Sequence, residues 1–180
     1  MRITKAELYN KYYSASRNLY LGDTEMPNHC HNRVTVYSAN PHDVAKIKQI
    51  FEDEKVFGQL IPEPDWHNTP LLTSDNCYGT KYGNDGELPQ YIEDPWRRLV
   101  FKSTGISDQR WYDWRLQHWD TKWDAYDVVV TDDDIEQVEI EFNTAWSPPE
   151  AICNALREQY PDVSISWFYD EPGCEIAGYL

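Results

Sequence analysis

Three segments of the chain alternate hydrophobic and polar residues, which is the pattern of a β-strand with one buried face. They are residues 32–37, 137–143 and 163–169. In the first segment, Val34 and Val36 are predicted to face the core, and Arg33, Thr35 and Tyr37 the opposite side. The run of valines at 128–130 predicts a fourth, buried strand, and residues 174–179 a short last one.

Two segments between these strands carry apolar residues at helical spacing instead. The first begins with Pro41, which suits the first position of a helix, and it is predicted to run to about residue 55. Its apolar stripe consists of Val44, Ile47, Ile50 and Phe51. The second is predicted to start with Ser147 as N-cap and Glu150 at the third helical position, the spacing of a capping box, and to stop at Pro161.

The order strand, helix, strand, strand, helix, strand defines the fold class. It predicts an α+β protein with the ferredoxin-like split βαβ fold, in which two helices cover one face of an antiparallel sheet. Residues 26–180 are predicted to form this single domain. Prolines and glycines interrupt the pattern over about 57–120, which indicates a large, loop-rich insertion with a short helix at 96–101. Residues 1–25 are predicted to form an N-terminal helical extension.

Tryptophans crowd one stretch near the end of the predicted insertion, at Trp111, Trp114, Trp119 and Trp123. Because a tryptophan side chain is costly to expose, the stretch forms either part of the core or a recognition surface. The core is favoured, since aromatic side chains mostly serve packing. Together with Trp146, these residues are predicted to form a structural aromatic cluster that clamps the insertion to the sheet.

Acidic residues outnumber basic ones by 31 to 16, which gives a net charge of -15. This balance argues against direct binding to nucleic acid, which needs a basic surface. The charge either keeps the domain soluble or presents a negative field to a basic protein partner. The residues predicted to bind such a partner follow the valine run: Asp132, Asp133, Asp134, Glu136, Glu139 and Glu141.

The cluster of His29, Cys30 and His31 would suit zinc if Cys77 or His67 came close. On an extended segment, however, the two histidines point one way and the cysteine the other. We therefore expect no metal and no cofactor, and a small buried cysteine at the entry to a strand.

The remaining composition predicts a location. The four cysteines form no CxxC pair, no signal-peptide pattern opens the chain, and no apolar run approaches the length that spans a membrane. We expect a cytoplasmic protein with reduced thiols and no membrane contact.

No motif specifies an enzyme. The chain has no phosphate-binding loop, dinucleotide fingerprint or nucleophile elbow, and the glycines of residues 78–83 lack the strand and helix that a phosphate cradle requires. Carboxylates that could act as general acid and base occur in and after the tryptophan stretch, at Asp113, Asp120, Asp124 and Asp127. Their spacing does not separate them from ordinary surface groups, so no catalytic residue is predicted.

Three strings and a closing segment are more specific. They are Met26-Pro27-Asn28-His29-Cys30-His31-Asn32, His118-Trp119-Asp120-Thr121-Lys122-Trp123-Asp124, Thr144-Ala145-Trp146-Ser147-Pro148-Pro149 and Tyr169-Asp170-Glu171-Pro172-Gly173. Together they resemble the YubB-like family of phage and conjugative-plasmid proteins, over roughly residues 26–180. The resemblance implies a ferredoxin-like C-terminal domain and residence on mobile elements, and it carries over no catalytic set.

The chain departs from the family pattern at four places. His29 stands where that family has tryptophan, His118 where it has asparagine and Asp120 where it has glycine, and residues 1–25 precede the usual start. The change at Asp120 puts a backbone conformation with positive φ in doubt there, because aspartate tolerates it less well than glycine.

Two classes of function remain open. The leading hypothesis is a mobile-element protein in the bacterial cytoplasm that binds and inhibits a host protein, such as a CRISPR or restriction system with a basic nucleic-acid-binding surface. The alternative is an enzyme or small-ligand binder with a cleft between insertion and sheet, near Asp113, Arg115, His118 and Asp124. A weaker third possibility is a nucleic-acid-binding module that stacks bases on its sheet. The sequence leaves the oligomeric state open.

Overall fold

The structure is a computed structural model that describes the chain except for residues 1–27 and 95–97. The described residues form two compact units. Residues 28–63 and 112–180 form the first, which we call the sheet unit, and the residues between 64 and 111 form the second, which we call the inserted unit. Each unit has its own core.

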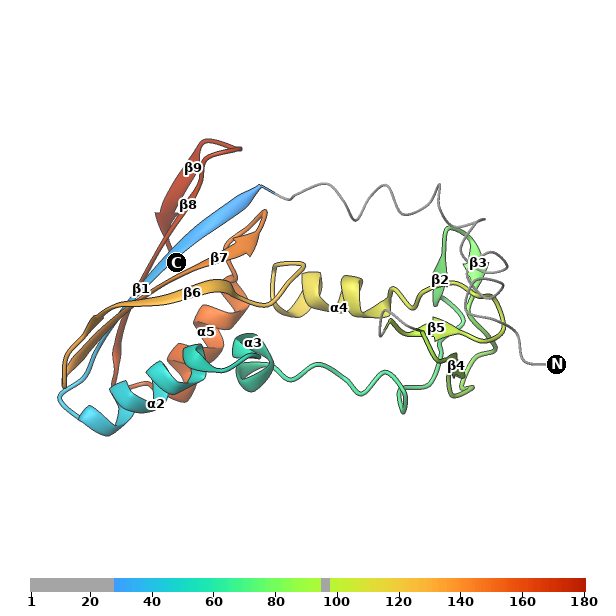
Figure 1. Cartoon of the computed structure of the whole chain (residues 1–180), viewed down its shortest axis with the longest axis horizontal. Coiled ribbons are helices and arrows are strands. Elements are labelled where there is room, and N and C mark those ends of the chain that lie inside the picture. The colour runs from blue at the N-terminus through green and yellow to red at the C-terminus, as the bar shows by residue number, and fades with distance from the viewer. Residues whose placement is uncertain (1–27, 95–97) are drawn as a thin grey trace. The chain divides into compact units, whose positions relative to one another are not determined.

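The described part of the sheet unit contains five strands: β1 (His29–Tyr37), β6 (Tyr126–Asp133), β7 (Gln137–Ala145), β8 (Ser164–Glu171) and β9 (Ile176–Tyr179). They lie in the order β6-β7-β1-β8-β9, with every neighbouring pair antiparallel. Helix α2 (Pro41–Glu52) follows β1, and helix α5 (Glu150–Gln159) joins β7 to β8 (Figure 1). The predicted α+β class with an antiparallel sheet is therefore confirmed, and β9 adds an edge strand to the βαββαβ order.

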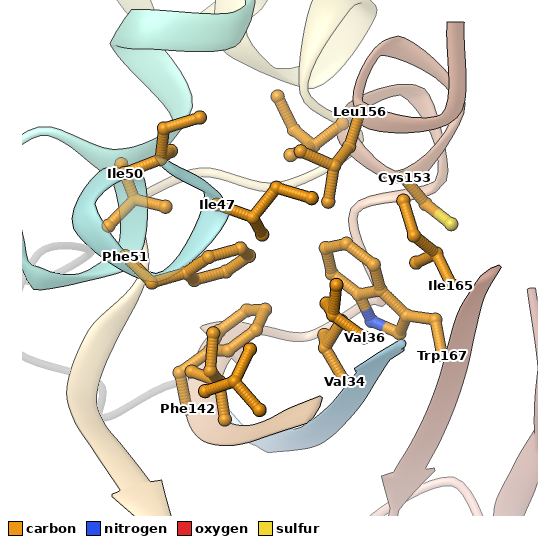
Figure 2. Packing of buried hydrophobic residues seen from close by; sticks show 14 of the residues in the cluster. Val34, Val36, Ile47, Ile50, Phe51, Phe142, Cys153, Leu156, Ile165 and Trp167 are labelled. Carbon is orange, nitrogen blue, oxygen red and sulfur yellow. The ribbon is translucent and has the colours of Figure 1, made fainter. Parts of the chain in front are cut away.

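The core of the sheet unit lies between the sheet and helices α2 and α5. Figure 2 shows side chains of both helices pointing toward those of β1, β7 and β8. The ring of Phe142 lies 5.4 Å from that of Phe51 and 5.5 Å from that of Trp167, measured between centroids. The Trp167 indole nitrogen donates to the side-chain oxygen of Asn32 at 3.0 Å, which satisfies the one polar group of this large buried ring. The core residues predicted for β1 and α2 are all buried.

Helix α2 begins as predicted and ends earlier than predicted. The Asn40 side chain accepts a hydrogen bond from the His42 amide at 3.2 Å, and Pro41 occupies the first turn. The helix ends at Glu52 rather than near Lys55. Its last turn holds no basic residue, and carboxylates there oppose the helix dipole, so the end is not stabilised electrostatically. A five-residue helix, α3 (Val56–Leu60), follows at once.

The predicted capping box of α5 is wrong. Pro149 occupies the N-cap position, and no side chain of the predicted box caps the helix. The Ser147 hydroxyl instead donates to the carbonyl of Asp120. The acceptor for the first turn comes from the same residue, because the Asp120 carboxylate accepts the Ala151 amide at 2.7 Å.

The valines of residues 128–130 do not form a buried strand. They belong to β6, an edge strand whose residues alternate between the two faces, and the Val129 side chain is 54% exposed. The prediction failed because a run of valines is typical of a strand covered on both faces, whereas the helices cover only one face of this sheet.

The inserted unit is built from two small hairpins, β2 (Asn76–Cys77) with β3 (Thr80–Lys81) and β4 (Tyr91–Ile92) with β5 (Val100–Phe101). The short helix predicted for residues 96–101 is wrong at its end, since Val100 and Phe101 form β5; residues 96 and 97 lie outside the described residues, as does the helix predicted for 1–25. The Tyr82 and Phe101 rings stack at 4.2 Å in the core of the unit.

The Arg110 side chain links several backbone segments of the inserted unit. Its guanidinium donates to the carbonyls of Trp66, Thr69 and Pro70 and to the carboxylate of Asp108. Arg110 also begins helix α4 (Arg110–His118), and the Asp108 side chain accepts its amide at 2.9 Å. This bond caps the first turn of the helix.

Candidate interaction surface

The face of the large sheet that looks away from α2 and α5 is the candidate functional site, and we call it the outer face. The strand register places these side chains on it: His29, His31, Arg33, Thr35, Tyr37, Tyr126, Val129, Asp132, Gln137, Glu139, Glu141, Asn143, Ser164, Ser166, Phe168, Asp170, Ala177 and Tyr179. They alternate along the strands with the buried residues of the core. The sheet unit therefore has one face committed to its core and one face that α2 and α5 leave uncovered.

Most of the charged side chains on the outer face are carboxylates. They belong to Asp132, Glu139, Glu141 and Asp170, with Asp127 beside them on β6. Arg33 lies among them, directly opposite Glu141 in the register of β1 and β7. Because the acids come from three different strands, the surface is acidic across the sheet and not only along one segment.

The acidic residues predicted to bind a partner do not all share this face. The structure brings Asp132, Glu139 and Glu141 together on it. Asp133 points to the helix side, where its carboxylate lies 2.6 Å from the ammonium of Lys48, and this contact raises the pKa of Lys48. Asp134 and Glu136 are exposed in the β6–β7 turn. These residues are close together in the sequence, but the β6–β7 hairpin places them on different sides of the sheet and in the turn.

Hydrogen bonds between neighbouring strands hold the carboxylates in place. Glu139 accepts from the hydroxyls of Thr35 on β1 and Thr131 on β6, at 3.4 and 3.1 Å. Asp132 accepts from the side-chain amide of Gln137 at 2.9 Å. These donors are neutral, so they orient the carboxylates without cancelling their charge.

A groove of about 370 Å³ crosses the outer face. Its lining includes Asp127, Glu141 and Asp170, which the sequence had not linked. Along one side, His31 Nδ1 lies 2.6 Å from the Asn143 side-chain oxygen, and the Asn143 nitrogen donates to Asp127 at 3.2 Å. The groove thus combines negative charge with a fixed polar row.

Aromatic rings border the acidic groups toward β9. The Arg33 guanidinium carbon lies 5.4 Å from the centroid of the Phe168 ring, and that ring lies 5.3 Å from the ring of Tyr179. Tyr179 is 70% exposed. The face therefore offers both carboxylates and aromatic surface, the two groups that attract cationic side chains.

The predicted aromatic cluster is divided between core and surface. Trp119 is 2% exposed, and its indole nitrogen donates to the Ile61 carbonyl at 3.0 Å, so its predicted core position is confirmed. Trp114 is half-buried and lies edge-on to Trp119 at 5.7 Å. Trp123 is half-buried beside Tyr126, and Trp146 is 41% exposed. Trp111, also half-buried, belongs to the inserted unit.

The strings that carried the family resemblance meet at one end of the sheet. The Thr121 hydroxyl donates to the Ala145 carbonyl at 3.0 Å and accepts the Ala145 amide at 3.1 Å. The Trp146 amide donates to the Asn28 carbonyl at 2.9 Å. The Lys122 ammonium lies 5.1 Å from the Trp123 ring and 5.5 Å from the Trp146 ring.

Asp120 adopts the positive φ that its replacement of glycine had put in doubt. Its φ is 60°, and Trp146 has a φ of 70°. Aspartate visits this region more readily than most residues, and the bond from Asp120 to the Ala151 amide fixes it there. The doubt was unfounded, because this partner, 31 residues away along the chain, stabilises the conformation.

The residues considered for an enzyme are engaged in structural contacts. Asp124 accepts the amides of Phe57 and Ala125 at 2.9 and 2.8 Å, and its burial raises its pKa. Arg115 pairs with Glu63 at 2.7 Å. His118 stacks on Trp114 with 4.3 Å between ring centroids. Asp113 is exposed on α4, and Asp127 belongs to the outer face.

The histidines and the cysteine at the start of β1 separate as their alternation predicts. Cys30 is fully buried, and its burial raises the pKa of the thiol to about 11. His29 Nδ1 lies 2.7 Å from the Tyr126 hydroxyl on the other face. Within residues 28–94 and 98–180, no three His, Cys, Asp or Glu side chains gather as metal ligands would. Over the same residues, every helix is too short or too polar to cross a bilayer.

Comparison with known proteins supports the fold of the C-terminal third. Residues 118–180 match the family model described as the ferredoxin-like domain in Api92-like protein. The matched segment contains β6, β7, α5, β8 and β9, and so most of the outer face. The ferredoxin-like C-terminal domain that the resemblance implied is thus supported by a likeness to Api92-like proteins, and the relationship to the YubB-like family stays a prediction.

A solved structure is also similar. It is the crystal structure of a protein Api92 from Yersinia pseudotuberculosis, with a TM-score of 0.47 and 11% sequence identity. The similarity covers 86% of this chain and 93% of that chain. None of the curated proteins matches the sequence.

Proposed function

We propose that this protein is an interaction protein that binds a basic surface of another protein through the outer face of its sheet. The observation that supports the proposal most is the gathering of Asp127, Asp132, Glu139, Glu141 and Asp170 on a face that α2 and α5 leave open. A surface of this sign speeds the encounter with a partner of opposite sign and fixes how the two dock.

The partner that suits this face is a host protein that handles nucleic acid. Such proteins carry basic channels for phosphate groups, and a row of fixed carboxylates is complementary to them. Inhibition follows because an acidic protein seated in such a channel excludes nucleic acid. We propose that the chain acts from a phage or plasmid against a host defence of the CRISPR or restriction type, in the bacterial cytoplasm and without a cofactor.

The test compares two triple variants that change the net charge equally. The first, Glu139→Gln, Glu141→Gln and Asp170→Asn, neutralises the outer face. The second, Glu54→Gln, Glu158→Gln and Asp162→Asn, neutralises exposed carboxylates away from that face. Wild type and both variants are immobilised, bacterial lysate is passed over them, and the heparin-binding proteins retained are quantified by mass spectrometry.

We expect a basic protein that wild type and the second variant retain, and that the outer-face variant retains at least tenfold less. Its binding to wild type should also weaken steeply with salt, because exposed charges are screened. The proposal fails if the two variants retain the same basic proteins, since net charge alone then explains the capture.

A further inference from the structure

The sheet ends in two edge strands that differ in how they could accept another strand. Strand β6 pairs with β7 through two register shifts and carries charged side chains, features that discourage pairing with a further strand. Strand β9 pairs with β8 in regular register, and its residues, Ile-Ala-Gly-Tyr, carry no charge. Of the two edge strands in the described part of the sheet, β9 is therefore the better suited to strand addition.

The hydrogen-bonding groups of β9 can be assigned a direction. The Leu180 amide donates to the Trp167 carbonyl at 3.0 Å, so this pair is of the hydrogen-bonded kind. Such pairs alternate with non-bonded pairs along an antiparallel ladder. Ala177 and Tyr179, opposite Asp170 and Phe168, are non-bonded, and their N–H and C=O groups point away from β8 to the open edge.

The same two residues adjoin the outer face. Ala177 lies opposite Asp170, which lines the groove, and Tyr179 lies opposite Phe168. In an added strand, the residues that bond to Ala177 and Tyr179 would place their own side chains on the outer face, because directly opposed residues share a face. Side chains in that position meet carboxylates and aromatic rings, which favour arginine and lysine.

We propose that β9 accepts an extended segment of the basic partner as an additional strand, with alternate arginine or lysine side chains on the outer face. Backbone bonds at the edge supply affinity, and the acidic face selects the residues, as in other cases of strand addition. This inference rests on the proposed function and names how the partner binds.

The probe is a capped eight-residue peptide in which arginine alternates with valine, with binding measured by titration calorimetry at low salt. The variant Ala177→Pro removes the outward amide and leaves the bonds to β8, since proline is tolerated where the N–H faces solvent. Ala177→Thr keeps the amide and is the control. We expect the peptide to bind Ala177→Pro at least tenfold more weakly than wild type or Ala177→Thr.

A second arm uses wild-type protein only, in case Ala177→Pro disturbs the fold. One peptide carries N-methyl groups on its arginines and the other on its valines. The arginine amides are those that would face β9, so methylation of arginine should abolish binding and methylation of valine should spare it. Amide exchange of Ala177 and Tyr179 should slow only with the peptide that binds.

The outcomes separate this inference from the proposed function. Equal binding of both N-methylated peptides, with binding still lost in the variant Glu139→Gln, Glu141→Gln, Asp170→Asn, overturns strand addition and leaves the acidic face as the site. Loss in Ala177→Pro together with full binding by that triple variant keeps strand addition and overturns recognition by charge. A dimer of the chain that dissociates in Ala177→Pro, with no peptide bound, overturns the inference in favour of a second copy.

Discussion

Asp124, one of the carboxylates considered for acid–base chemistry, holds two backbone amides in place. Its carboxylate accepts the amides of Phe57 and Ala125, and so ties the end of the tryptophan string to the start of α3. Burial raises its pKa above the ordinary value, and the two amide bonds only partly offset this. The buried site therefore disfavours the negative charge of Asp124, but the two amides still need its oxygen as an acceptor.

Substituting Asp124 should separate the acceptor from the charge. Asp124→Asn keeps an oxygen for both amides, so at pH 7 we expect it to be at least as stable as wild type. Asp124→Ala loses the acceptor and should lower the free energy of unfolding by about 1 kcal/mol. Urea unfolding at both pH 7 and pH 4.5 measures these differences. Equal losses for Asn and Ala would contradict the assignment.

The pH dependence follows from the sign of the shift. Because the folded state raises the pKa of Asp124, it binds the proton more tightly than the unfolded chain does. The protonated group is favoured at low pH, and stability is lost as pH rises from the ordinary value of 3.8 through the raised one. As pH falls from 7 to 4.5, the free energy of unfolding of wild type should therefore rise relative to that of Asp124→Asn.

The four cysteines should differ in reactivity. Cys30 and Cys153 are buried, and burial raises the pKa of each thiol; Cys77 is half-buried, and Cys174 is exposed. The hydrogen bond with Glu171 raises the pKa of the Cys174 thiol as well, so access of the reagent decides the order. We therefore expect iodoacetamide at pH 8 to modify the exposed Cys174 first and Cys30 and Cys153 only after denaturation. Mass spectrometry of the native protein checks this order, with Cys174→Ser as control. Early modification of Cys30 would contradict the fold of β1.

At the scale of elements, the sequence predicted correctly those features that depend on residues close together in the chain. Helix α2 was predictable because Asn40, Pro41 and the apolar stripe all lie within twelve residues of one another. The start of α5 was not, since its capping acceptor, Asp120, is far away in sequence. The valines of β6 misled because hydrophobicity alone does not distinguish an edge strand from a central one.

Among the tryptophans of the aromatic cluster, Trp119 should contribute most to the free energy of unfolding. The Trp119 ring lies edge-on to Phe57 at 5.8 Å and carries Arg115 at 4.8 Å from its centroid. Trp119→Ala should lower the free energy of unfolding by about 3–5 kcal/mol, through the cavity and the lost bond to Ile61. The control is Trp146→Ala, which removes a ring that is 41% exposed and should cost about 1 kcal/mol or less. Similar losses for both would contradict the division of the cluster.

At the scale of the whole molecule, the acidic face was half predictable. Alternation along β1 and β7 shows which side chains share a face on each strand, and it placed Arg33, Glu139 and Glu141 away from the core. It does not show which strands are neighbours. Asp170 joins the face only because β8 pairs with β1, and Asp133 leaves it because β6 is bulged. Adjacency of strands is a property of the fold and not of any one segment.

The inserted unit and the sheet unit hold separate cores, so a lesion in one should spare the other. Arg110 tests this, because its guanidinium donates to three carbonyls of the inserted unit and to the buried Asp108. Arg110→Met leaves that buried carboxylate without its cation, although it keeps the bonds from Tyr91 and from the backbone amide, and this costs about 3–5 kcal/mol. We expect amide exchange to speed up between residues 64 and 111 while β1 and β7 stay protected; Lys102→Met, at an exposed lysine, should change neither. Loss of protection in β1 would mean that the two units unfold as one.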